Sequence, residues 1–270
     1  PIARVQEAVK REAARFGCTV TRAELVGMIP QQALTDAAQW YLQLDNLTPE
    51  MIIEHRLAEL SETEPEEPNE ALFIERLAAG TAAPGGGAAA AFAGAMAAGL
   101  VGMVARLTLG KKKYLEVEAQ MQAVLEQADK LRADLTAAVA IDSAAFEAVM
   151  EAFKLPKATE EQTTARAAAI DQAYIHAAEV PMRVARDAVA VLGLAAIAAE
   201  RGNLNALSDA GSGAFLARAA FSGAAQNVRA NAAVVEDRAT AAAWLKELAG
   251  LEAHVTETLA GIERLLRERR

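Results

Sequence analysis

The sequence has few of the residues that build disulfide frameworks or metal centres. A single cysteine, Cys18, excludes an internal disulfide and gives no metal-site spacing. The three histidines, His55, His176 and His254, share no metal-binding pattern, so no metal is expected. Aromatic residues make up only 4% of the chain, whereas hydrophobic residues, led by alanine, make up 53%. This composition favours closely packed helices over a β-sandwich.

The sequence has no excess of positive charge, with 27 Lys and Arg against 36 Asp and Glu, and no targeting segment is visible. The net charge of −9 argues against a nucleic-acid-binding protein. No signal peptide is recognisable, so we expect a cytoplasmic protein. The run from Gly87 to Leu109 approaches the ~20 apolar residues of a membrane span. Its alanines and glycines are poor lipid-facing residues, however, and we expect no membrane association.

The first 60 residues are predicted to form a small α+β fragment. A helical period starts at Ile2, and the alternation from Cys18 to Met28 predicts a strand in which Cys18 is a small core residue. A further helix is expected to open at Pro30. Because one strand cannot form a sheet alone, and because the chain begins at Pro1 within a helical pattern, we expect the rest of this domain to lie upstream. Residues 61–69 are acidic and contain two prolines, which is typical of an exposed linker.

Residues 70–270 are predicted to form a mainly α domain, a bundle of about five long helices. The expected helices cover residues 87–109, 115–153, 159–201, 205–235 and 238–267. The first of these has no charge until Arg106 and is expected to be buried on nearly all sides. Thr159 is expected to cap the third helix, and Pro181 to kink or break it.

A glycine loop precedes the buried helix. Gly85, Gly86 and Gly87 follow Pro84 and can either form a tight packing turn or present backbone N–H groups to a ligand. At the other end of the helix, Lys111, Lys112 and Lys113 form either a solvated cluster or a carboxylate-binding patch. The sequence leaves both pairs of alternatives open.

One carboxylate interrupts an apolar stretch of the second long helix. Asp142 lies in AVAIDSAAFEAVM, where neighbours such as Val139 and Phe146 would partly desolvate it. Partial desolvation would raise its pKa and suit it to proton transfer near neutral pH. The alternative is a residue of the solvent-facing stripe.

Polar residues gather at two points of the helix predicted over 205–235. Asn203, Asn205, Ser208 and Asp209 cluster at its start, where capping and ligand contact are both possible. Asn227 and Asn231 share a face one turn apart. Asp209 and Asn227 lie on one stripe but about 27 Å apart. If both ends serve one site, an antiparallel partner subunit must bring them together, which favours a homodimer.

These stretches together resemble the cyclodeaminase domain of formimidoyltransferase-cyclodeaminases and the related methenyltetrahydrofolate cyclohydrolases. The resemblance is carried by APGGG, MVARLTLGKKKY, DSAAFEAVMEAFKLPK, GNLNALSD and NVRAN, in this order between residues 83 and 231. The segment AELVGMIPQQALTDAAQWYL resembles the end of a formimidoyltransferase domain. That domain's catalytic histidine would lie upstream of Pro1, so no transferase activity is expected here.

The resemblance implies closure of 5-formimidoyltetrahydrofolate to 5,10-methenyltetrahydrofolate with loss of ammonia. It assigns the proton-carrying role to Asp142. It assigns substrate binding to a further group of residues, whose cationic members would attract the glutamate tail of the folate. These are Gly85, Gly86, Gly87, Arg106, Lys112, Lys113, Asn203, Ser208, Asp209 and Asn227. It further implies a cytoplasmic enzyme of one-carbon metabolism and histidine degradation, with polyglutamylated folates as ligands, a homodimer or higher homo-oligomer, and no cofactor beyond tetrahydrofolate. Two alternatives stay open, a cyclohydrolase acting on the methenyl bridge and a non-catalytic oligomerisation or polyglutamate-channelling module.

Overall fold

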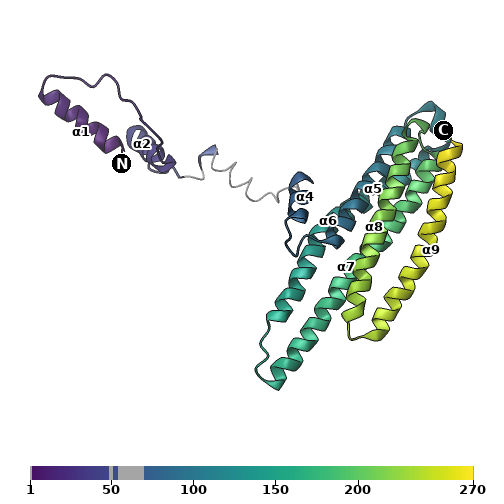
Figure 1. Cartoon of the computed structure of the whole chain (residues 1–270). Coiled ribbons are helices and arrows are strands. Elements are labelled where there is room, and N and C mark those ends of the chain that lie inside the picture. The colour runs from purple at the N-terminus through teal and green to yellow at the C-terminus, as the bar shows by residue number, and fades with distance from the viewer. Residues whose placement is uncertain (1, 49–50, 54–69, 270) are drawn as a thin grey trace. The chain divides into compact units, whose positions relative to one another are not determined.

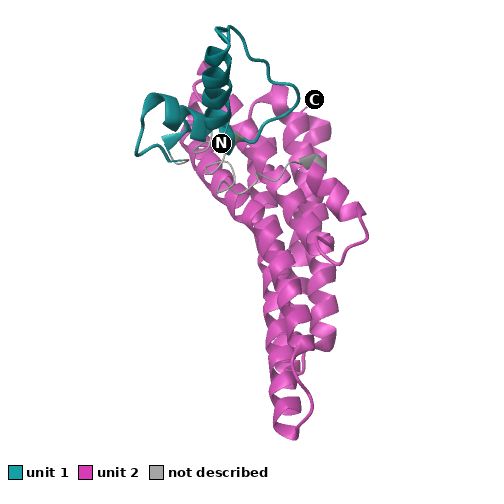
Figure 2. Ribbon diagram, turned by 90° about the vertical axis from the view of Figure 1, so that its left-hand side faces the viewer, with its two compact units in different colours: residues 1–69 teal, residues 70–270 magenta. Residues whose placement is uncertain are grey.

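The computed structural model describes residues 2–48, 51–53 and 70–269, and the chain divides into two compact units, residues 1–69 and 70–270 (Figure 2). Long helices dominate the second unit and lie side by side in Figure 1. Its helices are α4 (Glu70–Ala78), α5 (Gly86–Thr108), α6 (Glu118–Lys154), α7 (Glu160–Arg201), α8 (Leu207–Val234) and α9 (Arg238–Glu268), with short 3₁₀ turns at Lys112–Val117 and Leu204–Ala206. No strand occurs within the described ranges. The predicted mainly α bundle is confirmed.

Helix α5 lies against both α6 and α8 through very small side chains. Gly94 faces Leu135 of α6, where an added Cβ would lie 3.1 Å from a leucine methyl. Gly213 of α8 similarly lies close to the backbone oxygen of Ala97, at 3.3 Å from an added Cβ. Small residues therefore allow the helix axes to approach closely. By length and composition α5 could cross a membrane, but 61% of its apolar window is buried inside this bundle.

The ends of α7 follow their sequence signals, and the proline within it does not end the helix. The Thr159 hydroxyl accepts a hydrogen bond from the Gln162 N–H, so the predicted N-cap is confirmed. Helix α7 ends at Arg201, directly before Gly202. It continues through Pro181, and the predicted possibility of a break there is wrong. The proline removes one backbone hydrogen bond without ending the helix, because α7 packs against α6, α8 and α9 along its length.

The first unit contains α1 (Ile2–Arg15) and α2 (Gln31–Leu42). The strand predicted from Cys18 to Met28 is wrong, since residues 18–26 have no regular secondary structure. Cys18 is exposed, so its predicted place in a core is also wrong. A strand is stable only when a neighbour accepts its backbone hydrogen bonds, and the described part of this unit offers none. The linker predicted over residues 61–69 lies outside the described residues.

Candidate functional site

A cavity of about 290 Å³ lies at the N-terminal end of α5. Four helices and the preceding loop contribute to its wall. The lining residues are Ala82, Ala83, Gly85, Gly86, Gly87, Asp142, Ser143, Phe146, Val149, Met150, Phe153, Tyr174, Ala177, Asn227 and Asn231. The cavity therefore brings together the glycine loop, the carboxylate of α6 and the two asparagines of α8, which are far apart in the sequence.

Gly87 is required by the packing around this carboxylate. A Cβ at Gly87 would come within 2.6 Å of both Cγ and Oδ2 of Asp142, which is closer than real Cβ atoms approach other atoms. A Cβ at Gly86 would lie 3.3 Å from Nδ2 of Asn227. The tight packing expected of the loop is confirmed, and the loop also lines the cavity, so its contact with a ligand stays a prediction.

Asp142 is half-buried on the cavity wall. Burial raises the pKa of its carboxyl above the ordinary aspartate value, because a low-dielectric surrounding disfavours the charged form. The backbone N–H of Ala88, in the first turn of α5, donates to the carboxylate and opposes this shift, but burial is the larger effect. A carboxyl with a raised pKa and a fixed hydrogen-bond donor can exchange a proton nearer neutral pH than an exposed aspartate does.

The two asparagines of α8 have fixed amide orientations. Nδ2 of Asn227 donates to the Gly223 carbonyl at 2.9 Å, and Nδ2 of Asn231 donates to the Ala177 carbonyl of α7 at 2.7 Å. A carbonyl oxygen can only accept, so the amide nitrogen must face it. In each side chain Oδ1 remains as an acceptor for a ligand in the cavity.

The cavity also has an aromatic and apolar side. Phe153 of α6 and Tyr174 of α7 pack edge to face, with ring centroids 6.2 Å apart and planes at 82°. Phe146 and Met150 continue this wall along α6. Sequence reasoning placed Tyr174 only on a helix and did not select it as a site residue. The sequence feature that could have pointed to Tyr174 is its aromatic ring, because aromatic residues are rare in this chain.

Several residues predicted to bind substrate lie at the opposite end of α5. The buried Asn203 donates to the Leu107 carbonyl at 2.8 Å, and its own N–H donates to the Thr108 hydroxyl, so it ties α7 and α8 to the end of α5. Ser208 lines a separate hollow of about 310 Å³ together with Arg269. Asp209 follows Ser208 in the first turn of α8.

The predicted cationic group is also remote from Asp142. Lys112 and Lys113 begin the 3₁₀ turn that follows α5. Arg106 is paired with Asp129 of α6 at 2.5 Å. Helix α5 has 23 residues, which is about 35 Å at the α-helical rise. Within one chain, only Gly85, Gly86, Gly87, Asp142 and Asn227 of the predicted site residues line one cavity.

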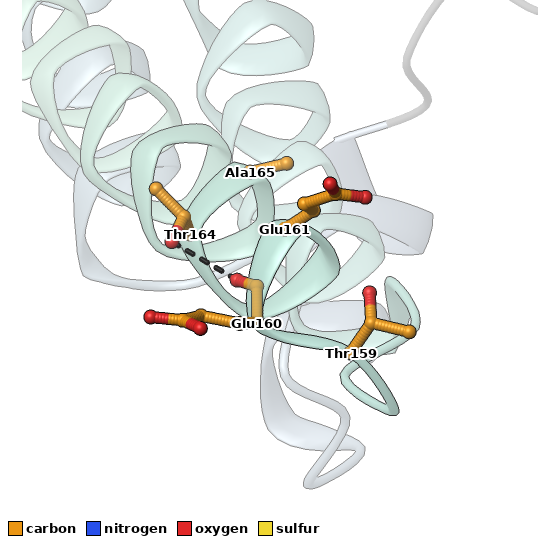
Figure 3. A pocket seen from close by; sticks show the side chains of 5 residues that line it. All are labelled: Thr159, Glu160, Glu161, Thr164 and Ala165. Atoms are coloured by element: carbon orange, nitrogen blue, oxygen red, sulfur yellow. Dashed lines mark hydrogen bonds between the residues drawn. The ribbon is translucent and has the colours of Figure 1, made fainter.

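A further hollow of about 680 Å³ lies at the start of α7. Its lining residues come from one helix end and are Thr159, Glu160, Glu161, Thr164 and Ala165. Figure 3 shows these side chains and the hydrogen bond that the Thr164 hydroxyl donates to the Glu160 carbonyl. The two glutamate carboxylates make this hollow negatively charged. All of its lining residues come from one helix end, so no second element forms an opposing wall. Among the described residues, no three His, Cys, Asp or Glu side chains come close enough to hold a metal ion.

Comparison with known proteins identifies the two units separately. Residues 71–250 match the formiminotransferase-cyclodeaminase family, and residues 1–62 match the formiminotransferase domain. The chain belongs to the formiminotransferase-cyclodeaminase family. The suspected resemblance is thereby confirmed. The cavity lies wholly within the cyclodeaminase match.

Relatives of this family carry more than one name. A methenyltetrahydrofolate cyclohydrolase of Methylorubrum extorquens is 51% identical over 66% of this chain and 86% of its own length. The formimidoyltransferase-cyclodeaminase of Gallus gallus is 31% identical over 99% of this chain, which spans 52% of that relative. The corresponding protein of Mus musculus is 32% identical, and this chain spans 43% of it. A crystal structure of a formiminotetrahydrofolate cyclodeaminase from Thermotoga maritima has a TM-score of 0.66 and 32% identity, over 73% of this chain and 95% of that one.

Proposed function

We propose that the second unit is a folate one-carbon enzyme that converts 5-formimidoyltetrahydrofolate to 5,10-methenyltetrahydrofolate and ammonia. The observation that carries this proposal is the Asp142 carboxyl, held between the glycine loop and a cavity lined by two oriented carboxamides. Family membership and the likeness to a solved cyclodeaminase support it.

One proton carrier is sufficient for the reaction, and Asp142 is the carboxyl on the cavity wall. N10 of the folate attacks the formimidoyl carbon, forming the N10–C bond, and the C–N bond to the terminal amine then breaks. The proton lost by N10 must reach the departing amine, which leaves as ammonia. A single carboxylate can accept the first proton and donate it in the second step. The raised pKa of Asp142 suits this exchange, because both of its protonation states are then accessible nearer neutral pH.

The rest of the cavity suits the remaining parts of the substrate. The formimidoyl group is an amidine, which is cationic when protonated, and it would meet the Asp142 carboxylate and the amide oxygens of Asn227 and Asn231. The apolar wall formed by Phe146, Met150 and Phe153 would cover an aromatic ring. Holding N10 against the formimidoyl carbon in this way would contribute through proximity.

The experiment is to offer the protein both folate substrates separately. With 5-formimidoyltetrahydrofolate, we expect the methenyl chromophore to appear and ammonia to be released. We expect D142N to slow both by about 100-fold or more while its far-UV circular dichroism stays unchanged. Turnover of D142N equal to that of the wild-type protein would remove Asp142 from the mechanism. A wild-type protein that binds folate without any turnover would instead support the alternative of a non-catalytic oligomerisation or channelling module.

The second candidate function is hydrolysis of the methenyl bridge. The 51% identity to a methenyltetrahydrofolate cyclohydrolase favours it. Here Asp142 would take a proton from a water molecule that attacks the same carbon. One of the two C–N bonds of the bridge would then break, the carbon would stay on the other nitrogen as a formyl group, and the released nitrogen would be protonated. Loss of the methenyl chromophore in the second assay, with no ammonia formed from the first substrate, would select this function.

We also propose a homodimer formed through α5 and α8. Helix α5 carries an apolar stripe of Met96, Leu100, Met103 and Leu107, of which Met96 and Leu107 are each 43% exposed. Beside it, α8 exposes Phe215. Large apolar side chains exposed on two packed helices are typical of protein interfaces.

An antiparallel pairing would also join the two groups of predicted binding residues. Asp209 and Asn227 lie about 27 Å apart on α8, so a twofold axis between them would bring Asn203, Ser208 and Asp209 of one subunit towards the other subunit's cavity. Lys112 and Lys113 lie at the same end as Asn203 and would then attract the glutamate tail, including polyglutamate forms. A cytoplasmic location and a part in histidine degradation belong to the same proposal.

A further inference from the structure

Pro181 leaves one carbonyl of α7 without its usual donor. In an α-helix the carbonyl of residue i accepts from the N–H of residue i+4, and the residue four after Ala177 is Pro181, which has no N–H. Helix α7 nevertheless runs unbroken from Glu160 to Arg201. The Ala177 carbonyl is therefore available to a donor from another helix, and Ala177 lines the cavity.

That donor is Asn231 of α8, whose Nδ2 lies 2.7 Å from the Ala177 oxygen. The contact is part-buried and joins residues 54 positions apart in the sequence. Because a buried carbonyl without a donor is unfavourable, this bond holds the carboxamide in one orientation. Its nitrogen is committed to Ala177, and its oxygen is left as an acceptor on a side chain that lines the cavity.

We propose that Asn231 is a substrate-positioning residue and that Pro181 orients it by leaving the Ala177 carbonyl free. The inference rests on the proposed folate function. The Asn231 oxygen accepts from N–H groups of the reduced pteridine ring, beside the equally fixed oxygen of Asn227 one helical turn away. Asp142 lies on the same cavity, so a ring held by these two oxygens keeps the reacting atoms near the carboxyl. Pro181 is buried, does not line the cavity and acts only through Asn231.

The test is a double-mutant cycle between P181A and N231A, with Q226A as a control that alters an exposed residue of α8 outside the cavity wall. We expect N231A to lower kcat/KM by about 10- to 100-fold, since it removes an oriented hydrogen bond. P181A supplies an N–H that competes for the Ala177 carbonyl and releases the amide, so we expect a smaller loss of about 3- to 10-fold without a lower Tm. In the N231A background, P181A should have no further effect on kcat/KM. Q226A should match the wild-type protein.

Two results of the mutant cycle would overturn the inference. Wild-type kcat/KM in N231A would remove Asn231 from substrate positioning, and an equal loss from P181A in both backgrounds would show that Pro181 does not act through Asn231. The same four proteins can also be compared by calorimetry, with the dissociation constant of tetrahydrofolate in place of kcat/KM. A wild-type protein that turns over neither substrate but binds tetrahydrofolate would overturn only the proposed function, and the binding cycle would still decide the inference. Failure of the wild-type protein to bind tetrahydrofolate would overturn both.

Discussion

At the scale of single residues, the site depends on a contact between one glycine and one carboxylate. Gly87 leaves just enough room for the Asp142 side chain to lie against the first turn of α5. That turn supplies the Ala88 N–H to the carboxylate, while the surrounding protein raises the pKa. The glycine loop therefore sets the position of the Asp142 carboxyl, and burial sets the direction of its pKa shift.

G87A is expected to displace the carboxyl, because the new Cβ would lie 2.6 Å from Cγ of Asp142. We predict a loss in kcat/KM of about 100-fold or more, as for a misplaced catalytic group. G99A on the same helix is the matched control, since its Cβ would meet only Arg132 Cδ at an ordinary 3.8 Å. G99A should keep full activity and gain up to about 1 kcal/mol of stability from helix propensity. Equal activity of the two variants would refute the steric argument.

D142N is expected to change how stability depends on pH. The pKa of Asp142 is raised in the folded protein above its ordinary value near 3.8, so between these two values the folded state binds more protons than the unfolded state. Stability of the wild-type protein is then lost as pH rises through this window, and it stays lower above the folded pKa. The Tm of D142N should thus equal that of the wild-type protein below the window and exceed it at neutral pH. A D142N protein less stable at neutral pH would contradict the burial effect.

At the scale of helices, the sequence predicts the long helices well. It predicts poorly those features that depend on a neighbouring element, such as a strand that needs a pairing partner. An uncharged apolar run predicted α5, and apolar periods between residues 115 and 267 predicted α6 to α9. The alternation at Cys18 suggested a strand, but alternation alone does not supply a pairing partner. Pro181 was interpreted from local backbone chemistry, whereas packing of α7 against its neighbours maintains the helix there.

The same limits explain which site residues could be predicted. Asp142, the three glycines and Asn227 stood out because each departs from the pattern around it. Asn231 could be paired with Asn227 from helical spacing alone, whereas Tyr174 enters the cavity through the packing of α7 beside α6 and α8, which no local pattern reports. Asn203 stood out as a polar residue in a cluster, yet its side chain is used to join helix ends. Capping and ligand binding require the same residue types, so the sequence could not separate them.

Packing between α5 and α6 gives a stability prediction at this scale. Leu135 is fully buried and fills the space above Gly94. L135A should lower the free energy of unfolding by about 2–5 kcal/mol, because the bundle cannot close the resulting cavity. L155A, at the exposed end of α6, should change it by less than about 0.5 kcal/mol. Urea denaturation followed by circular dichroism measures both, and similar midpoints would argue against this packing.

At the scale of the whole molecule, the α5 stripe predicts a partner subunit. M96E should convert a dimer to a monomer, because the charge would be buried at the interface. L245E is the matched control, since Leu245 of α9 is also 43% exposed but lies outside the stripe. Sedimentation velocity distinguishes the two variants. A wild-type protein that is monomeric and fully active would exclude a site completed by a second subunit.

The central claim is that a half-buried Asp142 transfers the proton between N10 and the departing amine. The most direct test is the pH dependence of kcat/KM for the wild-type protein and D142N with 5-formimidoyltetrahydrofolate. We predict an acidic limb whose midpoint lies above the ordinary aspartate range, because burial raises the pKa of Asp142, and we predict that this limb is absent from the residual activity of D142N. A wild-type limb at the ordinary aspartate value, or one that persists unchanged in D142N, would contradict the account.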